Sequence, residues 1–154
     1  MKNSEKIRLE SNLSYIKKVW EEKKSKYKLY NWKLRTIDTS DKAGVCSYND
    51  RTIYLSTRFM RGHNCDFKKI KQVLMHEIAH ALNPGHSHDS VWKRKCAEIG
   101  GDCRLAVTMV ELNKDWAVCC PKCKWRQDYD TKPKYDGIMV CGKCHTPVKI
   151  SYVK

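Results

Sequence analysis

The sequence predicts an α+β protein in which a core of helices and a small antiparallel sheet is followed by a small module held together by four cysteines. Three observations support this: an amphipathic helix containing His-Glu-x-x-His, short β-forming segments before it, and two Cys-x-x-Cys pairs near the C-terminus. The chain has 154 residues, enough for one ordinary domain and a small appendage. We therefore expect a core over residues 1–116 and a second domain over residues 117–154.

The first predicted element is a basic helix over residues 5–30. Its apolar residues recur at helical spacing, and lysines occupy many of the remaining positions. Glutamates alternate with the lysines, which favours packing of the apolar stripe on the sheet over a role at a membrane surface. The stripe consists of Leu9, Leu13, Ile16 and Trp20.

Three short strands are predicted next. Residues 32–37 form one strand, and residues 44–48 and 52–56 form a hairpin whose turn contains Asn49 and Asp50. Together these segments supply the small antiparallel sheet of the core.

A second helix is predicted over residues 67–82. Either Asn64 or Asp66 could cap its start, and the Asn-Pro-Gly sequence at 83–85 ends it. Its apolar residues cluster on one face, so that face is expected to be buried while the opposite face presents two histidines. The apolar positions are Ile70, Leu74, Ile78, Ala81 and Leu82.

The two histidines of this helix, His76 and His80, lie four residues apart, so both imidazoles can reach one zinc ion. Glu77 points about 100° around the helix, where it can act as a general base toward a water at an open metal position. This layout is typical of zinc hydrolases that cut peptide bonds. The alternative, two surface histidines beside a solvated glutamate, is disfavoured by the helical context.

Two later histidines are candidates for a third zinc ligand. His86 has the spacing of the longer His-Glu-x-x-His-x-x-Gly-x-x-His pattern, but Asn83 replaces the glycine of that pattern. His88 lies four residues before Trp92, at the start of a further predicted helix that ends at the Gly-Gly sequence 100–101. Spacing alone leaves the choice open.

The segment 76–101 resembles the SprT-like (Spartan) family of zinc metalloproteases. In that family the His-Glu-x-x-His helix is followed by a histidine, and then by a short helix with an aromatic residue four positions on, which here fits His88 and Trp92. The resemblance implies that His88 rather than His86 is the third ligand, although Asp89 replaces the usual glycine. It also implies a zincin-like metalloprotease core, in which an edge strand beside the zinc pairs with the backbone of an extended substrate.

Two Cys-x-x-Cys pairs with seventeen residues between them predict a zinc ribbon. Four thiolates at this spacing make a closed tetrahedral site, and zinc would hold so short a segment folded. Cys119 adjoins the first pair but has the wrong spacing to replace a ligand. The alternatives, unrelated thiols or two disulfides, are disfavoured by the repeated spacing, and many SprT-like proteins carry such a ribbon. The predicted ligands are Cys120, Cys123, Cys141 and Cys144.

The net charge of +14 is concentrated at the two ends of the chain: +7 over residues 1–35, +2 over residues 36–116 and +5 over residues 117–154. Basic flanks indicate a polyanionic partner such as nucleic acid, and exposed aromatic rings beside lysines can stack on unpaired bases. The alternative, solvated lysines with aromatic rings packed into the ribbon, stays equally open. The ribbon aromatics considered are Trp125, Tyr129 and Tyr135.

No segment has the length and apolar character of a signal peptide or a membrane span. We therefore expect an intracellular protein, cytoplasmic or associated with a nucleus or nucleoid, that is not secreted and has no membrane partner. Its compactness suggests a monomer. The nine cysteines are then expected to be zinc ligands and reduced thiols.

Together with the resemblance, the sequence predicts a zinc endopeptidase with one catalytic zinc on His76, His80 and His88, one structural zinc, and Glu77 as the catalytic base. SprT-like proteases degrade proteins crosslinked to DNA and are switched on by DNA. The expected partners are therefore protein substrates and single-stranded or junction-containing DNA. Two alternatives are a nucleic-acid-binding ribbon protein with an inactive zincin domain, and a general intracellular peptidase that DNA does not gate.

Overall fold

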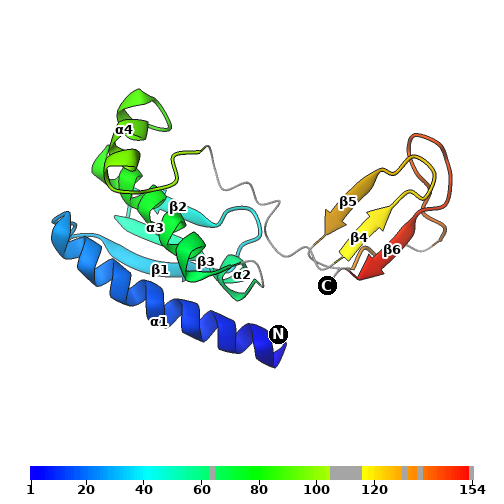
Figure 1. The fold of residues 1–154 in the computed structure, drawn as a ribbon, viewed down its shortest axis with the longest axis horizontal. Helices are drawn as coiled ribbons and strands as arrows, with labels where there is room; N and C mark the ends of the chain where they lie inside the picture. The colour runs from blue at the N-terminus through cyan, green and yellow to red at the C-terminus, as the bar shows by residue number, and fades with distance from the viewer. Residues whose placement is uncertain (63–64, 105–115, 130–131, 135–136, 153–154) are drawn as a thin grey trace. The chain divides into compact units, whose positions relative to one another are not determined.

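A computed structural model describes residues 1–62, 65–104, 116–129, 132–134 and 137–152 (Figure 1). The chain divides into two compact units, Met1–Leu112 and Asn113–Lys154, and each is described by itself. Helices and two small sheets make up these units, which confirms the predicted α+β class. The predicted domain boundary adjoins residues 105–115, which lie outside the described residues, so that boundary stays a prediction.

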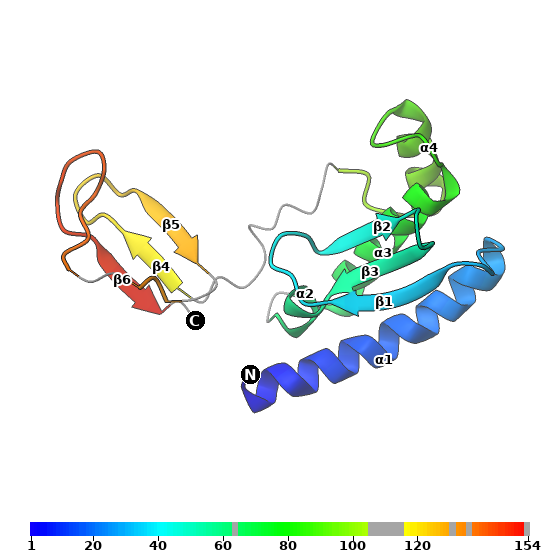
Figure 2. The ribbon, with the colours of Figure 1, turned by 180° about the vertical axis from the view of Figure 1, so that it is seen from behind.

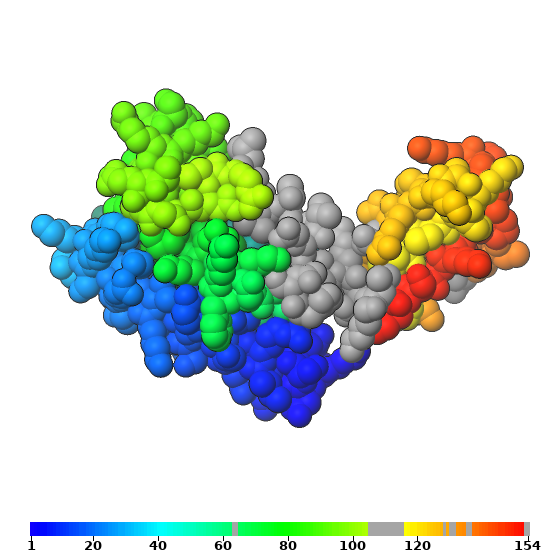
Figure 3. Space-filling view, viewed as in Figure 1, coloured from blue at the N-terminus to red at the C-terminus, as the bar shows by residue number. Residues whose placement is uncertain are grey.

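Helix α1 (Asn3–Lys26) lies on the surface of the first unit, where it forms the blue band in Figure 3. Its side chains Ile16, Val19 and Trp20 are buried in the core, while most of its lysines are exposed. Although α1 is long, neither it nor any other described helix is apolar enough to cross a membrane.

The C-terminal end of α1 lies before the predicted residue 30. Lys28 adopts a left-handed conformation with φ of 55°. The amide of Leu29 then donates to the carbonyl of Lys24 at 2.9 Å, and the amide of Lys28 donates to the carbonyl of Ser25 at 3.2 Å. This pair of bonds is a Schellman motif, which satisfies the last carbonyls and turns the chain out of the helix.

The sheet of the first unit has the order β1–β3–β2, with strands β1 (Lys33–Ile37), β2 (Gly44–Ser47) and β3 (Thr52–Ser56) (Figure 2). Strands β2 and β3 form the predicted antiparallel hairpin. The expectation of a wholly antiparallel sheet is wrong, because β1 pairs with β3 in parallel. Residues 38–43 lead from β1 to β2, which does not lie next to β1. Strand β3 then inserts between β1 and β2. Strand β2 is therefore at an edge of the sheet.

Helix α3 (Phe67–Leu82), which has the bounds predicted for it, packs on one face of this sheet (Figure 1). The short helix α2 (Thr57–Arg61) follows β3 directly and contacts α1. Apolar side chains from α1, β3 and α3 meet between these elements and form the main core. The core includes Ile16, Trp20, Ile53, Leu55, Ile70, Leu74 and Ile78.

Side-chain caps set the starts of α3 and of helix α4 (Ser90–Glu98). The Asp66 carboxylate accepts a first-turn backbone N–H of α3 at 2.7 Å, and the Asp89 carboxylate accepts the N–H of Trp92 at 2.9 Å. Such bonds satisfy donors that have no partner within the helix. Asn64, the other candidate cap of α3, lies outside the described residues.

The second unit is a three-stranded antiparallel sheet in the order β5–β4–β6, formed by β4 (Trp116–Cys119), β5 (Arg126–Tyr129) and β6 (Lys149–Tyr152). Few of its described side chains are buried, so a bound metal would have to supply much of its stability. The buried ones are Ala117, Val118, Cys120 and Cys141.

Candidate functional site

Three histidine side chains converge in the first unit. His76 and His80 lie one turn apart on α3, and His88 comes from the segment just before α4. The Nε2 atom of His88 lies 3.0 Å from Nε2 of His76 and 3.2 Å from Nε2 of His80. The backbone of His88 has a φ of 57°, an uncommon conformation of the kind that clusters at functional sites. The three nitrogens could together hold one metal ion.

Burial favours the neutral form of these imidazoles. It lowers the pKa of His76, and it lowers the pKa of His80 to about 4, with smaller contributions from the other two rings. The Nδ1 atom of His76 lies 3.1 Å from the carbonyl oxygen of Asp102. A proton on that nitrogen donates to the carbonyl and leaves the Nε2 lone pair facing the other rings. Neutral imidazole is the form that binds metal.

Trp92 forms the wall behind the histidines. Its ring centre lies 4.6 Å from those of His76 and His88 and 4.9 Å from that of His80. The indole is fully buried, so it restricts the movement of all three imidazoles. Its Nε1–H has no hydrogen-bond partner among the described residues, which costs free energy that packing must offset.

The histidine cluster fits zinc both chemically and geometrically. Zinc binds imidazole nitrogen at about 2.0–2.1 Å, and tetrahedral ligands at that distance lie roughly 3.3 Å from one another. The Nε2–Nε2 distances of 3.0 and 3.2 Å are close to this spacing. Three nitrogen ligands leave one position open, as catalytic zinc sites require.

Glu77 is buried beside the cluster, with 7% of its surface exposed. Burial raises the pKa of its carboxyl to about 8, while Lys42 and the backbone N–H of Cys46 act in the opposite direction. A Cβ atom on Gly44 would lie 2.9 Å from both Cγ and Oε1 of Glu77, so only glycine leaves room there. A carboxyl with this pKa can take up and return a proton near neutral pH.

An open cavity of about 770 Å³ borders the histidines and Glu77. Strand β2 lines it through Gly44, Val45 and Cys46, and residues 85–88 also line it. Tyr48, just after β2, donates its hydroxyl hydrogen to the carbonyl of His80 at 2.7 Å. This bond ties the β2–β3 hairpin to the end of the helix that presents two of the histidines.

His86 lines the same cavity but does not belong to the histidine cluster. Its Nδ1 atom lies 2.7 Å from Oδ2 of Asp89, the residue that caps α4. The structure therefore groups His88, not His86, with His76 and His80. The assignment of these residues as zinc ligands, and of Glu77 as the base, stays a prediction.

Three residues that shape the site were not among the predicted site residues. Gly44 makes room for Glu77, Tyr48 holds the hairpin, and the Asp102 carbonyl orients His76. A glycine at the start of a strand is a signal of close approach that could have identified Gly44. The contact of His76 with Asp102 is made by a backbone carbonyl, which every residue has. No pattern of side chains could therefore have predicted it.

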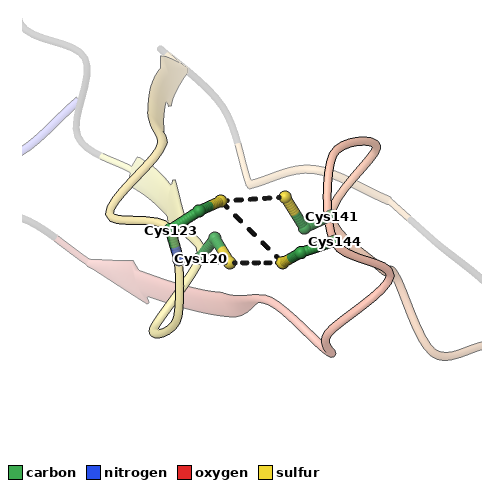
Figure 4. Close-up of side chains that lie close together, drawn as sticks. All are labelled: Cys120, Cys123, Cys141 and Cys144. Carbon is green, nitrogen blue, oxygen red and sulfur yellow. Dashed lines mark hydrogen bonds between the residues drawn. The ribbon is translucent and has the colours of Figure 1, made fainter.

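The four predicted ribbon cysteines converge in the second unit (Figure 4). Sulfur–sulfur distances are 3.5 Å for Cys120–Cys144, 3.4 Å for Cys123–Cys141 and 3.8 Å for Cys123–Cys144. Zinc–sulfur bonds of about 2.3 Å in a tetrahedron separate the sulfurs by roughly 3.8 Å, so the cluster is consistent with a zinc ribbon. None of the four forms a disulfide.

Local hydrogen bonds favour the thiolate form of two of these cysteines. Hydrogen bonds with Thr146 lower the pKa of Cys144 to about 6, and backbone hydrogen bonds at Lys143 and Cys144 lower the pKa of Cys141. Thiolates are the form that binds zinc. Cys119, at the end of β4, is not part of the cluster.

A sequence model of the SprT-like family matches residues 9–114. The match covers the sheet of the first unit, Glu77 and all three clustered histidines, and it ends before the four cysteines. No curated protein and no solved structure matches the chain.

Proposed function

Because the chain belongs to the SprT-like family and carries a metalloprotease-type domain, we propose that it is a zinc-dependent endopeptidase. The observation that supports this most strongly is the position of Glu77. Its carboxyl is buried, has a raised pKa, and borders both the three imidazoles and the cavity. A zinc site that is only structural has no use for such a group.

His76, His80 and His88 would hold the zinc, which when bound polarises the scissile carbonyl and lowers the pKa of a water toward ~7. Glu77 accepts the proton of the attacking water and delivers it to the leaving amine. Its carboxyl borders both the imidazoles and the cavity, which is the position that both transfers need. Trp92 keeps the three imidazoles from moving apart during the reaction.

We place the substrate backbone along strand β2. This strand pairs with β3 on one side and has no partner strand on the other among the described residues. Gly44, Val45 and Cys46 of β2 border the cavity. An extended peptide added at this edge would be held by main-chain hydrogen bonds, which read no particular sequence. Cleavage is therefore expected to tolerate many sequences.

We further propose that the substrates are proteins bound or crosslinked to DNA. The basic flanks support this, and so does a row of aromatic rings across the ribbon sheet. Trp116 of β4 pairs with Tyr129 of β5 and with Tyr152 of β6, so the three rings share one face of the sheet. The Nζ atom of Lys132 lies 5.4 Å from the centre of the Trp116 ring.

Such a surface is suited to unpaired bases, because every base has a face that can stack on an aromatic ring. Single-stranded or junction-containing DNA is therefore the proposed partner. Tethering to DNA would also confine a protease of broad specificity to substrates nearby, since it raises their effective concentration. Of the ribbon aromatics considered from sequence, Tyr135 lies outside the described residues.

The test is cleavage of casein by the zinc-loaded protein, with and without single-stranded DNA, beside a sample treated with a chelator. Cleavage that needs both zinc and DNA is the expected result. Cleavage at the same rate with and without DNA would indicate a general peptidase that DNA does not activate. No cleavage, together with tight and salt-sensitive DNA binding, would instead favour a binding protein with an inactive core.

A further inference from the structure

The turn after α4 folds the chain back onto Cys96. Gly100 adopts a left-handed conformation with φ of 78°, and the amide of Gly101 donates to the carbonyl of Cys96 at 2.8 Å. This bond spans the end of the helix as in a Schellman motif. The backbone after α4 therefore passes directly over the residue whose side chain points into the second core cluster.

Gly101 is fixed tightly in this position. A Cβ atom on it would lie 2.7 Å from Sγ of Cys96 and 3.4 Å from the backbone carbonyl carbon of Met75. The glycine backbone thus passes close to both the Cys96 thiol and α3, one residue before His76, and no larger residue fits there without a shift of its neighbours.

Cys103, two residues after Gly101, lies beside the Cys96 side chain. It packs against the cluster formed by Ala79, Trp92 and Cys96, and its thiol donates to the carbonyl of Gly101 at 3.4 Å. Cys96 is fully buried, whereas Cys103 is half-buried and so accessible to a small reagent. Burial raises the pKa of Cys96 to about 12, and a hydrogen bond with Cys103 adds to this rise.

Asp102 lies between Gly101 and Cys103, and its carbonyl oxygen is the one that orients His76. Its carboxylate accepts hydrogen bonds from Arg104, with Nε at 2.9 Å from Oδ1. The segment that carries Cys103 therefore also orients the imidazole of His76.

We propose that Cys96 and Cys103 form a reversible disulfide, and that its formation withdraws the Asp102 carbonyl from His76 and weakens metal binding at the histidine cluster. Formation of the disulfide does not depend on the proposed zinc site. Its effect on metal rests on the proposed zinc site, and the experiment below separates the two.

The oxidant is a small disulfide such as oxidised glutathione. The half-buried sulfur of Cys103 attacks it, forms a mixed disulfide and expels one glutathione thiolate. Cys96 then attacks the Cys103 sulfur and expels the second glutathione. Two protein thiols are oxidised, one glutathione disulfide is reduced to two thiols, and the two protein protons end on those thiols.

Disulfide formation is expected to weaken metal binding, because it would move the backbone that carries the Asp102 carbonyl. A disulfide draws two sulfurs from non-bonded contact to about 2.05 Å. Gly101 is held in place by the hydrogen bond from its amide to the carbonyl of Cys96 at 2.8 Å. The displacement therefore falls on Asp102 and Cys103, and so on the carbonyl that holds His76. Loss of such an outer partner typically weakens metal binding ~10–100-fold.

The disulfide can be read directly, because trypsin cuts after Lys95 and after Arg104 and releases both thiols in one peptide. The full-length protein is treated with oxidised glutathione, free thiols are alkylated, and the digest is analysed by mass spectrometry without reduction. We expect a peptide that has lost two hydrogens and carries no alkyl group. A peptide that stays doubly alkylated at every glutathione ratio would overturn the proposal.

The effect of the disulfide on metal binding is measured with cobalt in place of zinc. Cobalt bound to the four ribbon cysteines gives thiolate charge-transfer bands. Cobalt bound to the imidazoles does not, so release from the two sites can be followed separately. Oxidation should speed chelator removal of cobalt from the imidazole site at least tenfold, and Cys103→Ala should abolish that change. Cys65→Ala, which removes another buried thiol, should leave the change intact. Equal release rates before and after oxidation would overturn the link to His76. Absence of peptidase activity would contradict only the proposed function.

Discussion

Among single residues, Glu77 can occupy its position mainly because Gly44 has no side chain. An added Cβ on Gly44 would meet Glu77 and Val73 at 2.9 Å, so the carboxyl lies against the bare backbone of the edge strand. We propose that the substrate backbone pairs with the same strand. One element would then position both the proposed base and the scissile bond, and glycine at position 44 would be required for both.

Replacing Gly44 by alanine is expected to lower kcat roughly tenfold to a hundredfold, because displacement of a catalytic group by about 1 Å can cost ~10²-fold. Zinc content should not change, since the atoms nearest to an added Cβ on Gly44 belong to Glu77 and Val73 and not to a histidine of the cluster. Steady-state peptide hydrolysis and metal analysis of the same samples check both statements.

The matched control is Gly142→Ala in the ribbon, where an added Cβ meets nothing within 4 Å. It should leave kcat at the unsubstituted value. Full activity in Gly44→Ala would contradict the close contact between this strand and Glu77.

The two neighbouring histidines offer a second residue-level prediction. His88→Ala should weaken zinc binding by more than the ~10–100-fold typical of an outer partner, because it removes one of three nitrogens. His86→Ala should keep zinc, because the imidazole of His86 binds Asp89 instead of the cluster. Competition with a chelator measures both affinities, and the opposite order would reassign the third ligand.

Among the elements, α3 determines the site, because it presents His76, Glu77 and His80 on one side and core residues on the other. Asp66→Ala should lower the free energy of unfolding by about 1 kcal/mol, the usual cost of losing a side-chain cap. Urea unfolding measures this, with the exposed Lys68→Ala in the same first turn as the control. Equal stability of the two variants would contradict the role of the cap.

Helix α3 could be predicted with its bounds because its signals are local. Apolar periodicity, a capping aspartate and the sequence 83–85 all act within a few residues of the helix. The pairing of His76 with His80 follows from the same periodicity. His88 is different, because its approach depends on a left-handed backbone conformation that no local pattern indicates.

Other features could not be predicted because they are contacts between distant backbone groups. The parallel pairing of β1 with β3 depends on how residues 38–43 cross the end of the sheet. The bond from His76 to the Asp102 carbonyl joins residues 26 positions apart and does not depend on the side chain at 102. The early end of α1 results from Lys28 in a conformation more usual for glycine.

For the whole molecule, we propose that cleavage belongs to the first unit and DNA binding chiefly to the second. Tyr152→Ala should weaken binding of single-stranded DNA by about 1–3 kcal/mol, the usual value of one base stacked on an aromatic ring. Tyr30→Ala, which removes an exposed ring from the first unit, is the control. Fluorescence anisotropy with a labelled oligonucleotide measures both, and equal affinities would contradict binding through the aromatic row.

We propose that Glu77 is the catalytic base of a zinc peptidase. Hydrolysis of an unstructured protein by Glu77→Gln, beside the unsubstituted protein at equal measured zinc content, tests this role. Glutamine keeps the size of the side chain but cannot take up the proton, so zinc should stay bound and cleavage should fall at least ~100-fold. Undiminished cleavage by a zinc-loaded Glu77→Gln preparation would show that Glu77 is not the base.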